Sequence, residues 1–232
     1  MAMSTLSFNL RKLRASARSR IKLSRTSKLG CWSWSLAAFE TCPGAIGVDG
    51  NAVDACAGCY ARGGFYVMPD AKALRAFNRE DWQREDFADD MVNALLGEDK
   101  FRWFDSGDMY SLALAMKMLD VMKRTPWVKH WLPTRMQKFA KFSAVIAAMQ
   151  ALPNVMVRWS ADSVDGSHSV EHGSVIVPTA ADAPANATVC EAYLRGGKCG
   201  PCDACYDKTV KLIAYPAHGA TMRKVIRLQL AA

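Results

Sequence analysis

Eight cysteines, gathered in two groups near the two ends of the chain, restrict what this sequence can fold into. The groups are Cys31, Cys42, Cys56 and Cys59, and then Cys190, Cys199, Cys202 and Cys205. Disulfide frameworks are typical of small secreted domains with thin cores. This chain has 232 residues, 50% of them hydrophobic, so it can bury a core of its own, and its start lacks the apolar run of an export signal. Metal-bound thiolates therefore explain the cysteines better than disulfides do.

The spacing of the second group favours an iron-sulfur cluster over zinc. Cys199-Gly-Pro-Cys202-Asp-Ala-Cys205 is a CxxCxxC run, and Cys190 lies a short way before it. Bacterial ferredoxins hold clusters with such a run and one further cysteine. We call Cys190, Cys199, Cys202 and Cys205 the C-terminal quartet and expect it to bind a 4Fe-4S cluster, with a four-thiolate zinc site as the alternative.

The first group allows two interpretations. Cys42, Cys56 and Cys59, here called the N-terminal triad, have no nearby His and are the ligand set of a 4Fe-4S cluster that leaves one iron open to a ligand. If Cys31 also binds, the centre is closed and suited to structure or electron transfer. Cys31 begins an alternating stretch that predicts a strand, where a buried cysteine can equally be a small hydrophobe.

The cysteine-free middle of the chain alternates strand and helix patterns. Short apolar runs at 101–104, 127–132 and 155–159 recur at nearly even intervals, and helical spacing follows the first two at 110–122 and 136–152. This alternation is typical of βαβ units with parallel strands. Further patterns predict helices at 69–78 and 86–96 and strands at 174–177 and 211–215. We expect a single α/β domain over residues 31–232, preceded by a basic arm over residues 1–30.

Polar residues follow the central strands. Asp105-Ser106-Gly107-Asp108 comes after the first, Pro133-Thr134-Arg135 after the second, and Ser160-Ala-Asp162-Ser163 after the third. Because the carboxyl ends of parallel strands share one edge of a sheet, these groups are expected to converge there as an active site. The alternative is that they only cap the following helices. His218 follows the 211–215 strand and could face the same edge.

The formal charge of +8 is unevenly placed. Residues 1–30 contain no Asp or Glu and hold Arg11, Lys12, Arg14, Arg18, Arg20, Lys22, Arg25 and Lys28. Such an arm could bind nucleic-acid phosphates, or it could be a solvated leader. It also has the composition of an organelle transit peptide, although nothing else in the sequence supports that reading. Because no apolar run is long enough to cross a bilayer, we expect a cytoplasmic protein without a membrane span.

A set of short motifs resembles the bacteriophage gene-product-88 family over about residues 27–220. The motifs are Cys42-Pro-Gly-Ala, Cys56-x-x-Cys59-Tyr-Ala, Asp105-Ser-Gly-Asp, Ser160-x-Asp162-Ser, the C-terminal cysteine run and Tyr215-Pro-x-His218-Gly. The resemblance implies a phage or prophage protein, which would act in the cytoplasm of an infected host.

More distantly, a cysteine triad before βα units with polar strand ends resembles the radical S-adenosylmethionine enzymes. The resemblance implies a partial (β/α) barrel with cysteine-rich N- and C-terminal segments, in which the N-terminal triad holds a 4Fe-4S cluster. Ser106, Gly107 and Asp108 would face the methionine amine of S-adenosylmethionine, and Ser160 and Asp162 its ribose. The C-terminal quartet would hold an auxiliary cluster. The usual triad of that superfamily is CxxxCxxC, whereas Cys42 and Cys56 are more widely separated.

The leading functional hypothesis is an iron-sulfur protein with one or two clusters and a small-molecule ligand at the open iron. Its chemistry would be radical S-adenosylmethionine cleavage or another cluster-centred reaction. The catalytic candidates are Asp105, Asp108, Asp162 and His218. One alternative is sulfur transfer or desulfurisation at an open iron. The other is a nucleic-acid-binding phage regulator with structural iron-sulfur or zinc sites.

Overall fold

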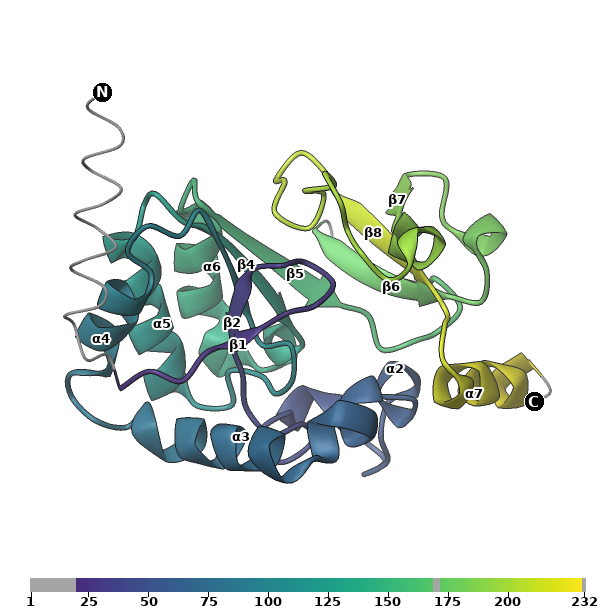
Figure 1. Ribbon diagram of the computed structural model, residues 1–232. Coiled ribbons are helices and arrows are strands. Elements are labelled where there is room, and N and C mark those ends of the chain that lie inside the picture. The colour runs from purple at the N-terminus through teal and green to yellow at the C-terminus, as the bar shows by residue number, and fades with distance from the viewer. Residues whose placement is uncertain (1–19, 169–171, 231–232) are drawn as a thin grey trace.

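The computed structural model describes residues 20–168 and 172–230, and its central feature is one eight-stranded sheet (Figure 1). The strand order is β1-β2-β3-β4-β5-β6-β8-β7. Within this sheet, as the described residues form it, the β1–β2 pair is antiparallel and the other neighbouring strands run parallel. The strands are β1 Ser24–Arg25, β2 Trp32–Trp34, β3 Lys100–Trp103, β4 Lys129–Thr134, β5 Val155–Ser160, β6 Gly173–Val177, β7 Ala187–Val189 and β8 Leu212–Pro216.

Helices cover one face of the sheet and one of its edges. The α-helices are α2 Asp54–Ala57, α3 Pro69–Asp81, α4 Phe87–Ala94, α5 Leu112–Arg124, α6 Ser143–Ala151 and α7 Ala220–Leu230. Short 3-10 helices span Pro43–Ala45, Tyr60–Arg62, Gly64–Val67, Met136–Lys138, Ala140–Phe142, Ala180–Asp182 and Glu191–Arg195. Helices α4, α5 and α6 lie side by side on one face, and α3 crosses the edge below them (Figure 1). In the described part of the chain, no helix is both long and apolar enough to span a bilayer.

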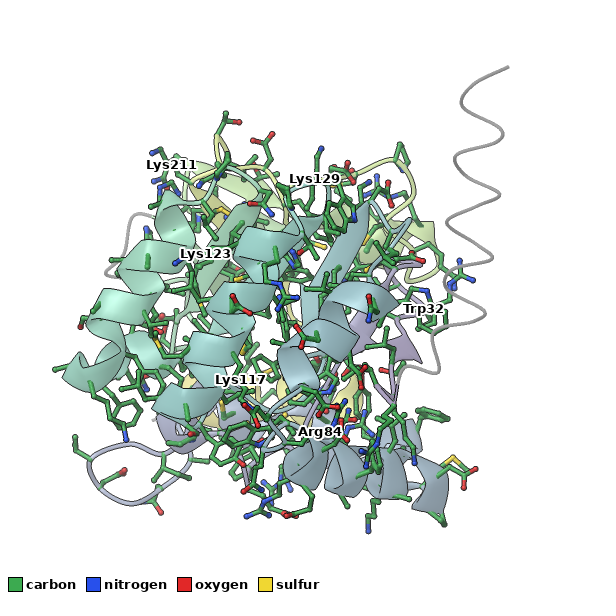
Figure 2. All side chains as sticks on the ribbon, turned by 90° about the vertical axis from the view of Figure 1, so that its left-hand side faces the viewer. Trp32, Arg84, Lys117, Lys123, Lys129 and Lys211 are labelled. Atoms are coloured by element: carbon green, nitrogen blue, oxygen red, sulfur yellow. The ribbon has the colours of Figure 1, made fainter. Side chains whose placement is uncertain are left out.

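The core lies between the sheet and the α4–α6 layer. In β3, Phe101 and Trp103 are fully buried in this core, whereas Arg102 between them points to the opposite face because side chains alternate along a strand. Met118 and Met122 lie on the inner side of α5 and are fully buried. Figure 2 looks onto the outer side of this helical layer, where Lys117 and Lys123 of α5 are labelled.

The predicted α/β class is confirmed, and the parallel strands agree with the predicted runs to within two residues at most boundaries. The sheet is not closed, because β1 and β7 stand at its two ends and do not pair with each other. The helix expected over 136–152 begins only at Ser143, and two 3-10 turns precede it. Tertiary contacts explain the difference, since Lys138 Nζ donates a hydrogen bond of 2.8 Å to Gly44 O and so holds this segment at the sheet edge.

His130 in β4 links the core to the pH dependence of stability. The ring is fully buried, accepts a hydrogen bond from Trp103 Nε1 at 3.2 Å and contacts Thr125 Oγ1 at 2.8 Å. Burial lowers the pKa of His130 from 6.5 to about 3. The neutral ring therefore stabilises the fold fully above pH 6.5, and this contribution is lost as the pH falls toward about 3.

We predict that His130 steepens the loss of stability in acid. Between pH 6 and pH 4, this one group should remove about 1.4 kcal/mol of unfolding free energy per pH unit, because the unfolded chain takes up the proton. Urea unfolding at pH 7 and pH 5 of the parent and of His130→Gln measures this contribution. The variant should be less stable at pH 7 and lose less on acidification. An equal loss in both proteins would contradict the assignment.

Candidate metal centre

The turn after β3 is locked onto the loop that follows β2. Ser106 Oγ donates a hydrogen bond of 2.7 Å to Leu36 O, and Leu36 N donates one of 3.0 Å to Ser106 O. Gly107 has φ +82°, and a Cβ there would lie 2.6 Å from Leu36 Cβ, so only glycine fits this contact. Phe104 also adopts a left-handed conformation, with φ 57°. The predicted Asp-Ser-Gly-Asp segment is thus a rigid turn at the carboxyl edge of the sheet.

Asp105 lies in a buried polar cluster at this edge. Its carboxylate accepts hydrogen bonds from the Ser35 hydroxyl and, at 3.3 Å, from Tyr66, and it lies 3.9 Å from Arg75 Nη2. Tyr60 Oη donates a hydrogen bond of 2.6 Å to the Asp105 carbonyl. The aromatic residue directly after Cys59 therefore contacts the backbone of the turn.

Ser106 and Asp108 of the same turn have their polar groups occupied. Ser106 Oγ accepts a hydrogen bond from Arg75 Nε at 2.6 Å, and Asp108 accepts bonds from Thr134 Oγ1 at 2.7 Å and Arg135 N at 2.9 Å. Burial raises the pKa of Asp108, and these hydrogen bonds oppose the rise. Asp108 is therefore a buried link between the β3 turn and the end of β4.

The three cysteines of the N-terminal triad lie within electrostatic reach of one another. Cys42 follows β2, Cys56 lies in α2, and Cys59 follows that helix. Burial, together with Asp108 and the other two thiols, raises the pKa of Cys42 to about 12. A thiolate is unfavourable here unless positive charge compensates it.

Basic residues stand beside Cys56. Burial raises the pKa of Cys56, while Arg135 and Lys138 lower it. Asp162 forms ion pairs with both of these side chains, at 3.3 Å from Arg135 Nε. Ala55 N donates a hydrogen bond of 2.8 Å to Asp162 O, which ties α2 to the end of β5. Asp162 thus lies at the same edge as Asp108, as the strand pattern predicts.

The C-terminal quartet forms a second group. Burial raises the pKa of Cys199, and Cys190 and Cys202 raise it as well. Burial also raises the pKa of Cys205, and Cys190 raises it as well. Cys205 Sγ lies 3.5 Å from Tyr215 Oη. Cys202 is exposed.

Arg158 of β5 holds the end of this segment in place. Its guanidinium donates hydrogen bonds to four backbone carbonyls in one loop: Ala204 at 2.6 Å, Cys205 at 3.1 Å, Asp207 at 2.9 Å and Val210 at 3.0 Å. Arg158 is fully buried, and burial lowers its pKa. The loop's carbonyl dipoles therefore offset the burial of a charge.

Cys31 lies apart from the triad. It precedes β2, whereas Cys42 follows that strand, so the two lie toward opposite ends of β2. Cys31 Sγ is 3.2 Å from Tyr206 Oη, next to Cys205 in the sequence. The structure thus brings Cys31 to the C-terminal segment.

Two other candidates, Ser160 and His218, lie at strand ends, and within the described residues no hydrogen bond or ion pair joins either of them to the Asp105 cluster. Ser160 ends β5 and pairs with Ser174 of β6. His218 is exposed, and its Nδ1 lies 3.1 Å from Pro216 O. The basic arm is described only from Arg20 onward, and residues 1–19, which carry much of the nucleic-acid prediction, lie outside the described residues.

The donor set fits an iron-sulfur cluster in its chemistry. Both groups consist of thiols, which are the ligands such clusters take; Cys56 and Cys59 raise the pKa of Cys42, and Cys190 and Cys202 raise that of Cys199. Within residues 20–168 and 172–230, no three His, Cys, Asp or Glu side chains meet the geometry for a single metal ion.

Three arginines near these groups, Arg75, Arg102 and Arg158, were not predicted as site residues from the sequence, whereas Arg135 belongs to one of the polar strand ends expected at this edge. Arg102 and Arg158 did leave one signal, since each is a charged residue inside an otherwise apolar strand run, where a charge needs a specific partner.

We predict that Arg158→Met releases the loop that follows the C-terminal quartet. Loss of hydrogen bonds to four buried carbonyls should lower the unfolding free energy by about 3 kcal/mol and increase the reaction of Cys205 with a thiol reagent in the native protein. Arg124→Met is the matched control, since Arg124 on the outer side of α5 forms only partly exposed ion pairs. It should change stability by less than about 1 kcal/mol. Equal effects of the two variants would contradict the role of Arg158.

Comparison with known proteins gives one match. A family model described as gene product 88 matches residues 5–220. No curated protein and no solved structure matches the chain.

Proposed function

The chain belongs to the gene product 88 family, and from its two cysteine groups we propose that it is an iron-sulfur protein whose N-terminal triad carries the reactive centre. One observation carries the proposal: the thiols form two groups whose members lie close enough to act on one another electrostatically. Cys56 and Cys59 raise the pKa of Cys42, and Cys190 raises the pKa of Cys199 and Cys205. Burying several thiols together is unfavourable for their charged form, and a bound metal centre supplies the compensating charge.

The surroundings of the two groups support different roles. The N-terminal triad lies at the carboxyl edge of the parallel strands, beside Asp108, Asp162 and Arg135. Ligand sites of open α/β sheets lie at this edge. The C-terminal quartet instead has four thiols, and Arg158 in the middle of β5 binds the backbone at its last cysteine, Cys205. We therefore assign the reactive site to the triad and a closed, electron-transfer or structural site to the quartet.

When bound, a cluster held by only three thiolates would offer one iron with a free coordination position, and its reduced form would donate one electron. Around it, the chain's own residues fix charge and orientation. Arg135 and Lys138 favour the thiolate of Cys56, and Asp162 keeps both basic side chains in place. Asp105, held by Ser35 and Arg75, offers a carboxylate to a ligand entering past Tyr60 and Tyr66. S-adenosylmethionine, with its amine and carboxylate, is our first candidate ligand.

We predict about eight irons and as many sulfides per chain in protein purified without oxygen, because two groups each fit one 4Fe-4S cluster. Cys56→Ala and Cys202→Ala should each lower the iron content by about half. Iron, acid-labile sulfide and zinc analysis with the absorbance spectrum measures this. Cys31→Ala is the matched control and should keep the parent iron content, since Cys31 contacts Tyr206. Colourless protein that contains only zinc would contradict the proposal.

We predict that Asp105→Asn and Asp162→Asn keep the iron content but weaken the response to S-adenosylmethionine. Each change removes a carboxylate at the ligand edge without removing a thiol. The measurement is the spectral change on titration of the cofactor into anaerobic protein, and loss of one charge-assisted hydrogen bond should weaken it about tenfold. An unchanged response in both variants would rule out this edge as the ligand site, whatever the iron content.

A further inference from the structure

The face of the sheet turned away from α4–α6 carries an unusual pair of side chains. Arg102 of β3 and Trp131 of β4 are direct neighbours in the parallel register. The Arg102 guanidinium lies 4.7 Å from the centre of the Trp131 ring. The two side chains therefore stack on one another on the same face.

Both side chains hold a buried N–H group without an acceptor. In the part of the chain that the structure describes, Arg102 Nε and Trp131 Nε1 have no hydrogen-bond partner. A buried donor without a partner destabilises a fold, and native proteins seldom leave one unpaired. Because Arg102 and Trp131 are neighbours in the sheet, an acceptor bound beside this pair would satisfy donors that the fold leaves unpaired.

The charge of Arg102 is also incompletely balanced. No carboxylate of the described residues lies within ion-pair distance of its guanidinium, in contrast to Arg75, Arg84 and Arg135. Its Nη2 donates a hydrogen bond of 3.3 Å to the hydroxyl of Tyr60, and Asp105 acts on it only through space. A positive charge with free donors selects an anion.

We propose that Arg102 and Trp131 form a binding site for an oxyanion, namely the carboxylate or phosphate group of a small molecule. Arg102 Nε and Trp131 Nε1 donate to its oxygens, and the guanidinium supplies the charge. Neither side chain offers an acceptor, so the site discriminates against amines and other cations.

The site lies between the two cysteine groups. Tyr60, which accepts the Arg102 hydrogen bond, follows Cys59 directly, and Tyr206, whose ring lies 6.0 Å from that of Trp131, follows Cys205. Tyr60 is 59% exposed, so its side of the site is open to solvent. This inference goes beyond the proposed function and needs no iron, since every group in it belongs to the polypeptide.

The test is isothermal titration calorimetry of the full chain, purified without oxygen, with inorganic phosphate in one series and acetate in another, at constant ionic strength. Trp131→Phe keeps the ring and removes one donor, and Arg102→Gln removes the charge. We expect each to weaken binding of the preferred anion about tenfold or more, as for lost hydrogen bonds to a charged group. The tighter of the two series identifies the phosphate or the carboxylate as the ligand group.

Lys123→Gln is the matched control, because Lys123 is a cation on the helix-covered face, away from this site (Figure 2). It should leave binding unchanged. Absence of binding in both series, equal weakening by Lys123→Gln, or unchanged binding in Trp131→Phe would each overturn the proposal. Thermal unfolding and iron content of each variant separate loss of the site from loss of the fold or of the clusters.

Discussion

The contact between the β3 turn and the loop after β2 sets the geometry of the whole ligand edge. Two backbone hydrogen bonds join these segments, from Leu36 N to Ser106 O and from Asp108 N to Thr41 O, and Gly107 lets the chains approach. Cys42 follows Thr41 directly, so this contact carries the first thiol of the triad to the buried Asp108. Because a parallel sheet gathers its carboxyl ends at one edge, the ends of β4 and β5 complete the same site with Arg135 and Asp162.

Buried arginines are the second organising element, and each is used differently. Arg75 binds polar groups of the β3 turn, and Arg158 binds a ring of backbone carbonyls below the C-terminal quartet. Both are satisfied by the protein itself. Arg102 is not, because its Nε lacks an acceptor and its nearest charge acts through space. Since placing a guanidinium among protein atoms without partners is unfavourable, this contrast supports the oxyanion site proposed at Arg102.

Much of the architecture follows from local patterns, and the site follows only in part. Short apolar runs at nearly even intervals located β3, β4 and β5, and the parallel order brought Asp108 and Asp162 to one edge. These signals are short-range and survive without tertiary information. The prediction of an α-helix over 136–142 was wrong. Lys138 in this segment donates a hydrogen bond to Gly44 O, a long-range contact that the local pattern does not indicate. The acceptors of Arg158 are backbone carbonyls far along the chain, which no spacing rule can identify.

The position of Cys31 shows why spacing alone could not assign the cysteines. In the sequence it groups with the N-terminal triad, yet the segment before β2 packs against the C-terminal segment. Cys199 N donates a hydrogen bond of 2.9 Å to Lys28 O, and Lys198 Nζ donates one of 2.8 Å to Ser27 O. The segment before β2 therefore packs against the C-terminal quartet, and the segment after β2 leads to the N-terminal triad. Arg102 lies between the N-terminal triad and the C-terminal quartet. Tyr60 contacts it on one side, and on the other side Trp131 packs against Tyr206, so a charge at either cysteine group changes the electrostatic potential at the same guanidinium.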